Sequence, residues 1–162
     1  CKDVGGTGVK VRPNGLPKER SVEQTLEQIG RSLNEVGRFA GEHGIQIRVE
    51  VHGRGTSEIA HMKTIFDIAD DPNVVVCWNC NPTDLAGDGL TANYRSLQNR
   101  MGTIHIHDLR NNKYPWEELF PLLQDTTAES FTGWALLEEG SVPQDIVPAM
   151  KENQERWKVL TS

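Results

Sequence analysis

Short apolar segments alternate along the chain with longer segments in which apolar residues recur every three or four positions. The short segments have the length of strands, and the longer ones have the spacing of one buried helical face. Five such pairs follow one another, separated by turn-forming residues. This order predicts successive βα units and a parallel sheet. The expected strands are Val9–Arg12, Ile45–Val51, Val74–Trp78, Thr103–His107 and Trp134–Glu138.

Capping residues and apolar spacing predict the helices between these strands. Ser21, with Gln24 three residues later, has the pattern of a capping box and opens the longest helix. Pro115 stands where the first turn of a helix tolerates proline. Since no linker separates the units, we expect one domain over residues 1–162. The expected helices are 21–40, Ser57–Ala69, Thr91–Asn99, Trp116–Leu123 and Gln144–Leu160.

Polar side chains gather where the expected strands end. Because side chains alternate across a strand, these polar residues share one face, opposite the neighbouring valines and isoleucines. Placing them beneath a second helix layer would be costly. The inner face of a (β/α)₈ barrel, in contrast, opens at the carboxyl ends of its strands. We therefore predict an α/β fold of the TIM-barrel type. The strand-end residues are Arg12, Glu50, His52, Asn79, His105, His107 and Glu138.

The residue types at these strand ends predict a metal site. Two carboxylates, imidazoles and an amide oxygen are together a ligand set for one Mn²⁺, Mg²⁺, Co²⁺ or Zn²⁺ ion. No single strand has enough ligands, but four neighbouring strands do. Such an ion polarises a carbonyl and a neighbouring hydroxyl, and a carboxylate beside it moves a proton at the carbon between them. This is the chemistry of aldose–ketose isomerisation or epimerisation.

Composition narrows the possible partners and location. The net charge is −6 with no basic block, which argues against a nucleic-acid partner. No apolar run approaches the roughly 20 residues that cross a membrane. The three cysteines, Cys1, Cys77 and Cys80, form no disulfide framework, which favours a reducing, cytoplasmic compartment. Cys77 and Cys80 have the CxxC spacing but straddle a strand end, so we expect no redox role for them.

Several segments, in their order and spacing, resemble the xylose-isomerase-like TIM-barrel superfamily of sugar phosphate isomerases and epimerases. The similarity covers the whole chain, but only strands four to eight of the barrel. The chain begins with Cys1 rather than Met, so we expect a longer native protein with three preceding βα units, or pairing with another copy. The matching segments are GVKVRPNGLP at 8–17, RVEVHG at 48–53, VVVCWNCNPTD at 74–84, TIHIHDLR at 103–110, YPWEELFPLL at 114–123 and GWALLEEG at 133–140.

The resemblance implies a role for each strand-end residue. It implies a divalent metal held by Glu50, Asn79, His107 and Glu138, with Glu50 and Glu138 also acting as the acid/base pair. It places His52 and His105 around the metal ligands or against the substrate, and it implies that Arg12, Asn14 and Arg110 hold hydroxyls or a phosphate. Two positions depart from the family pattern: Asn79 stands where many relatives have Asp, and Pro82 where a His is common.

The substrate implied by the resemblance is a small sugar or sugar phosphate. Two other functions fit the same residues. A lyase or dehydratase acting on a related polyol would use the same carboxylates, and a non-catalytic carbohydrate-binding module would keep the fold without turnover. An endonuclease is the least expected function, because DNA binding needs a cationic surface that the net charge of −6 does not indicate.

Overall fold

Five parallel strands form a single sheet in the computed structural model, which describes residues 1–125 and 131–162. The strands lie side by side in the order in which they occur along the chain, and every neighbouring pair is parallel. This confirms the predicted α/β class with successive βα units. The strands are β1 (Gly8–Val11), β2 (Gln46–Glu50), β3 (Val74–Trp78), β4 (Met101–Ile106) and β5 (Trp134–Leu137).

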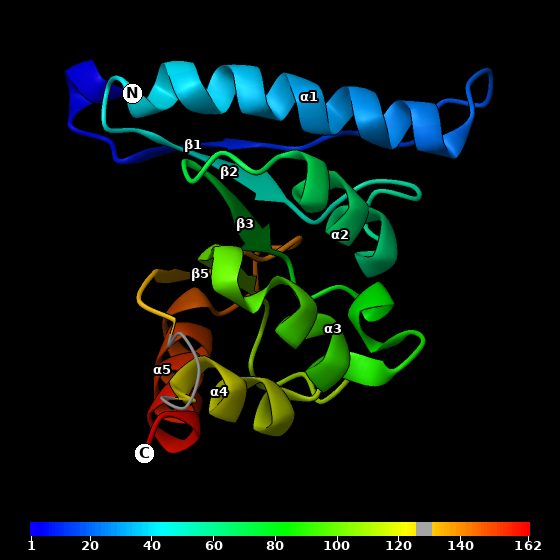
Figure 1. Ribbon diagram of the computed structural model, residues 1–162. Helices are drawn as coiled ribbons and strands as arrows, with labels where there is room; N and C mark the ends of the chain where they lie inside the picture. Colours follow the sequence, from blue (N-terminus) through cyan, green and yellow to red (C-terminus); the bar gives the residue numbers. More distant parts are fainter. Residues whose placement is uncertain (126–130) are drawn as a thin grey trace.

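One helix follows each strand, and the helices succeed one another in an arc around one side of the sheet (Figure 1). Ser21 caps the first helix as predicted, because its side chain accepts a hydrogen bond from the backbone N–H of Gln24. Among the described helices, none is both long enough and apolar enough to cross a bilayer. The helices are α1 (Val22–Gly41), α2 (Ile59–Ile68), α3 (Gly89–Leu97), α4 (Trp116–Gln124) and α5 (Ile146–Leu160), with short 3₁₀ segments at Lys2–Val4, Pro82–Leu85 and Gln98–Arg100.

The core lies between the sheet and this arc of helices. Val49, Val76 and Ile104, on three neighbouring strands, are fully buried and belong to one apolar cluster with the helices. Residues at the alternate positions, such as Glu50 and His105, lie outside that cluster. The alternation predicted from the sequence therefore holds: apolar side chains face the helices, and the polar set faces the concave side of a curled half-barrel.

Several element ends differ from prediction by one or two residues, and two of these differences matter for the site. β4 ends at Ile106, so His107 lies in the loop that follows the strand. α2 begins at Ile59 rather than Ser57, because residues before it form a turn in which Gly53 and Gly55 have positive φ angles of 112° and 81°.

Candidate metal and acid–base site

Glu50 is the buried carboxylate at the centre of the site. Glu50 is the last residue of β2, and only 2% of its surface is exposed to solvent. Its position follows from the alternation in β2, where Ile47 and Val49 face the helices and Glu50 faces the other way. A buried carboxylate is costly unless a cation or hydrogen-bond donors compensate it, so the neighbours of Glu50 define the site.

His105 of β4 and Glu138, at the end of β5, approach Glu50 from the second and third strands after β2. Nδ1 of His105 lies 2.9 Å from Oε2 of Glu138 and 3.5 Å from Oε1 of Glu50. The ligand atoms of these three residues all lie within 4.8 Å of one another. Glu138 directly follows β5, and its backbone N–H donates to Ile106 O at 2.8 Å. The imidazole therefore stands between two carboxylates that are far apart in the sequence.

Asn79 adds an amide oxygen to the same point. Its Oδ1 lies 3.2 Å from Nδ1 of His105, and its Nδ2 donates to Oδ1 of Asn81 at 3.3 Å. The residue is buried at the end of β3. Three of the four residues predicted as metal ligands, Glu50, Asn79 and Glu138, thus surround one ring nitrogen of His105.

His107 lies outside the group formed by Glu50, His105 and Glu138, so its role as a metal ligand stays a prediction. Its Nδ1 lies 2.9 Å from Glu138 O and its Nε2 lies 3.0 Å from Asn79 O, so both ring nitrogens face backbone carbonyls. The physical reason is the end of β4 at Ile106: beyond it, the chain carries His107 across the neighbouring strand ends rather than into the carboxylate pair. His105, predicted as a surrounding or substrate-binding residue, lies between the carboxylates instead.

Lys10 is the residue of the site that the sequence reasoning missed. Its Nζ lies 2.9 Å from Oε2 of Glu50 and 4.0 Å from Oε1 of Glu138. The close contact with Glu50 outweighs partial burial and raises the pKa of Lys10 above its usual value. The available signal was its position two residues before Arg12, on the same face of the first strand.

The contacts described for the other predicted substrate-binding residues lie outside this cluster, so their substrate-binding roles stay predictions. Arg12 is exposed and lines a cavity of about 280 Å³ beside α1. Asn14 has a positive φ of 60°, and its carbonyl, like that of His52, accepts a hydrogen bond from the Thr56 hydroxyl. Arg110 is held by two carboxylates, Asp108 at 2.5 Å and Glu152 of α5 at 2.7 Å. The structure thus gives the Asn14 and His52 backbones a role in joining two loops.

Glu139 turns away from its neighbour Glu138. Its carboxylate accepts a hydrogen bond from the backbone N–H of Asp108. The two adjacent acids therefore lie in different environments: Glu138 contacts the His105 ring, and Glu139 contacts the Asp108 backbone.

A second buried acid, Asp84, lies in the 3₁₀ segment that follows β3. The Tyr114 hydroxyl donates to Oδ2 of Asp84 at 2.8 Å and accepts from Nε1 of Trp78 at 3.1 Å. Oδ1 of Asp84 has no hydrogen-bond partner among the described residues. Burial raises the pKa of Asp84 to about 7, so near neutral pH this carboxyl is partly protonated.

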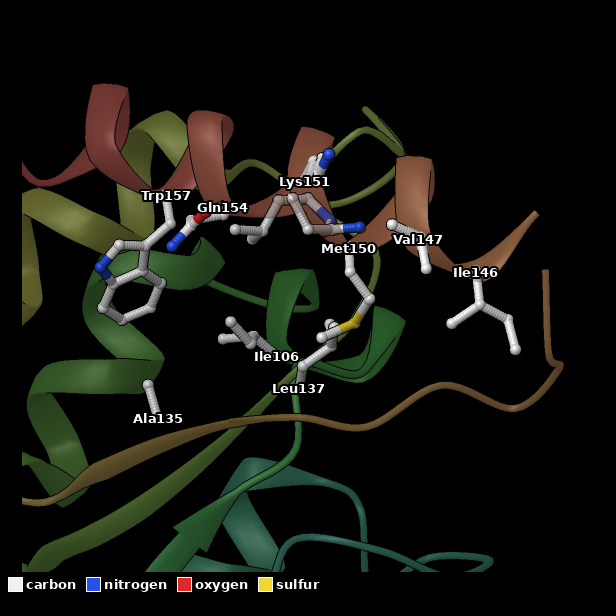
Figure 2. Close-up of a pocket in the computed structure, with 11 residues that line it drawn as sticks. Ile106, Ala135, Leu137, Ile146, Val147, Met150, Lys151, Gln154 and Trp157 are labelled. Atoms are coloured by element: carbon white, nitrogen blue, oxygen red, sulfur yellow. Dashed lines mark hydrogen bonds between the residues drawn. The ribbon is translucent and has the colours of Figure 1, made fainter.

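An apolar cavity of about 520 Å³ lies on the opposite side of the sheet, between α5 and strands β4 and β5. Figure 2 shows Met150 reaching from α5 toward Leu137, with Trp157 of the same helix facing Ala135. Its lining lacks the carboxylates and imidazole of the cluster described above. The cluster of Glu50, His105 and Glu138 therefore lies on the concave, polar side of the sheet and not in this cavity.

A half-barrel of parallel βα units with acidic and imidazole side chains at its strand ends defines a class of TIM-barrel proteins. The family described as Xylose isomerase-like TIM barrel matches residues 1–159, and the chain belongs to that family.

Individual relatives are distant in sequence but close in fold. An inosose dehydratase of Mesomycoplasma hyopneumoniae is 25% identical over 103 residues, which are 63% of this chain and 34% of that protein. The chain has a TM-score of 0.79 at 17% identity to a 3-keto-D-glucoside 4-epimerase from E. coli, covering 98% of this chain and 66% of that one. For an L-ribulose 3-epimerase the TM-score is 0.80 at 12% identity, covering 99% of this chain and 63% of that one.

The chain thus spans about one third of the curated relative and about two thirds of the epimerase chains. At these identities the solved structures establish the shared fold, and the inference to function comes from the site of this chain.

Proposed function

We propose that this chain carries the metal site and the acid–base pair of an isomerase or epimerase that acts on a sugar or sugar phosphate. The observation that carries the proposal is the convergence of Glu50, His105 and Glu138 within 4.8 Å of one another. Asn79 adds an oxygen beside the same imidazole nitrogen. The sugar epimerases among the structural relatives have the same fold.

The donor set suits a divalent ion. Carboxylate oxygens, an imidazole nitrogen and an amide oxygen are the ligands that Mn²⁺, Mg²⁺, Co²⁺ or Zn²⁺ takes in proteins. Oε2 of Glu50 is buried and accepts no well-aligned hydrogen bond from the described residues, although Lys10 lies near it. Glu50, Asn79, His105 and Glu138 would therefore hold the ion. When bound, it would polarise the substrate carbonyl and the adjacent hydroxyl.

The two glutamates perform the proton transfer in this proposal. One carboxylate removes the proton from the carbon next to the carbonyl, and the other returns a proton to the opposite face or to the adjacent carbon. They come from different strands, β2 and β5, on either side of His105, which suits transfer to and from two positions. General acid–base groups of this kind contribute about 10²–10⁴-fold to the rate.

A dehydratase is the second candidate, because the curated relative is an inosose dehydratase. The same carboxylate would remove the proton, and a hydroxyl would then leave as water from the neighbouring carbon. Product analysis separates the two reactions: an epimerase returns an isomer of unchanged mass, whereas a dehydratase returns a product lighter by one water.

The test replaces each glutamate with its isosteric amide. We expect Glu50→Gln and Glu138→Gln to weaken Mn²⁺ binding, measured by calorimetry, and to lower turnover of ketoses such as D-tagatose, D-psicose or an inosose by about 10²-fold or more. Glu139→Gln is the matched control, since it changes the same charge one residue away. Full activity in Glu138→Gln would refute the assignment. Absence of Mn²⁺ binding at micromolar metal in the unaltered chain would favour a non-catalytic carbohydrate-binding module.

A further inference from the structure

Lys10 occupies the position beside the two carboxylates where a cation is needed. Its ammonium lies 2.9 Å from Glu50 and 4.0 Å from Glu138, so the same two carboxylates that would bind a divalent ion already contact a positive charge. The placement is fixed by the sheet: Lys10 pairs in register with Arg48, two residues before Glu50 on the adjacent strand. Its side chain reaches past that partner to the end of β2.

The charges of the site show why this position matters. Two carboxylates and one ammonium leave one net negative charge beside the imidazole and the amide. Glu50 is 2% exposed, whereas the Lys10 side chain is 43% exposed. The carboxylate is therefore fixed and buried, while the lysine has open space at the rim into which it can withdraw.

We propose that Lys10 is a resident counter-cation that a divalent metal ion must displace from Glu50 and Glu138. Before metal binds, its ammonium compensates the buried Glu50 carboxylate. When a divalent ion takes these oxygens, the like charge of Lys10 opposes it, and the side chain moves toward solvent. The inference rests on the proposed metal site. It adds that Lys10 keeps the affinity of this site for a divalent ion lower than the ligands alone would give.

The experiment measures Mn²⁺ binding to the full chain by calorimetry for the unaltered protein and for Lys10→Met. A unit charge this close to a divalent ion in a partly solvated site changes the affinity by an order of magnitude or more. We therefore expect Lys10→Met to bind Mn²⁺ at least about tenfold more tightly. Lys10→Arg keeps the charge and should keep the weaker affinity. Lys18→Met, in an exposed loop, changes the net charge equally and should leave the affinity within about twofold.

Thermal unfolding gives a second readout that does not depend on turnover. Without metal, Lys10→Met should melt at a lower temperature than the unaltered chain, because Glu50 loses its compensating charge. Saturating Mn²⁺ should raise its melting temperature by more than it raises that of the unaltered chain. If metal-free Lys10→Met does not fold by circular dichroism, Lys10→Gln and refolding in Mn²⁺ decide the matter: recovery with the ion supports the proposal, and no recovery overturns it.

The outcomes separate this inference from the proposed function. If the unaltered chain binds Mn²⁺ through Glu50 and Glu138 but Lys10→Met binds it equally or more weakly, the counter-cation role is wrong and the metal site stands. If neither protein binds Mn²⁺, both proposals fail. If only Lys10→Met binds it, Lys10 blocks the site in the unaltered chain, so the counter-cation role holds while the metal-dependent activity proposed for the unaltered chain fails.

Discussion

The buried carboxyl of Asp84 shows how a single residue can make stability depend on pH. The residue is fully buried, and burial raises its pKa to about 7 from an ordinary value near 4. Between these two values the folded chain binds a proton that the unfolded chain releases. The free energy of unfolding contributed by this group therefore falls as the pH rises from about 4 to about 7, and above pH 7 the full cost of the buried charge is present.

Asp84→Asn should remove this cost, because the neutral amide can still accept the hydrogen bond from Tyr114. We expect the variant to be more stable than the unaltered chain by up to about 4 kcal/mol at pH 8, and by only about 1.5 kcal/mol at pH 5. Urea unfolding at both pH values measures the difference. Asp88→Asn, at an exposed helix N-cap, is the control. Equal effects of Asp84→Asn at both pH values would contradict the prediction.

The sequence alone does not show which histidine, His105 or His107, lies between the two carboxylates. Both histidines have the same parity on β4, so alternation predicts that both face inward. Their depth relative to the carboxylates depends on where β4 ends and on a register shift between β3 and β4 at Val76 and Cys77. Neither is encoded in the local pattern. Lys10 was missed for a related reason, since a lysine on a short edge strand has the pattern of a solvent-facing residue.

At the scale of elements, the apolar periods of the sequence predicted all five strands and all five α-helices described above, but not the three short 3₁₀ segments. β3 was predicted with the bounds observed, since five consecutive residues are buried and turns bound them on both sides. The start of α2 was wrong by two residues. Thr56, just before it, donates its hydroxyl hydrogen bond to Asn14 O in a distant loop, and such a tertiary contact has no signal in the local sequence.

The packing of α1 against the next βα unit depends on a glycine. A Cβ added at Gly30 would lie 2.6 Å from Ile68 Cβ and 3.1 Å from Ile65 O of α2. We expect Gly30→Ala to destabilise the fold by about 1–3 kcal/mol through overpacking, despite the roughly 1 kcal/mol by which alanine favours a helix over glycine. Chemical denaturation measures this effect. Glu35→Ala, on the exposed side of α1, is the control and should change stability by less than about 0.5 kcal/mol. If Gly30→Ala is as stable as the unaltered chain, the prediction is wrong, and α1 and α2 can move apart to accommodate the added methyl group.

Across the whole molecule, burial is uneven from one end of the sheet to the other. All five residues of β3 are buried, whereas Trp134 and Leu136 of β5 are 68% and 45% exposed. In α5, Ala149 and Asn153 are the buried residues, and the apolar cavity separates this helix from β4 and β5 (Figure 2). The last βα unit is therefore the one with the fewest buried contacts, yet it carries Glu138, half of the proposed acid–base pair.

This unevenness predicts that the β5–α5 unit opens more readily than the centre of the sheet. Native-state hydrogen exchange should show protection factors in α5 at least about tenfold below those in β3, because few buried apolar contacts oppose local opening. Uniform protection would contradict the prediction.

Mn²⁺ should couple this unit to the rest of the molecule, since Glu138 would share the ion with Glu50 and His105 on the better-packed strands. If opening of β5 releases the ion, metal at 100 times its Kd should slow exchange in residues 134–137 by up to about 100-fold. The effect on α1, which contributes no ligand, should be much smaller. Glu138→Gln should abolish this slowing of exchange by Mn²⁺, because β5 would no longer hold the ion. Equal slowing in α1 and β5, or slowing that survives Glu138→Gln, would mean that Mn²⁺ acts elsewhere than at this strand.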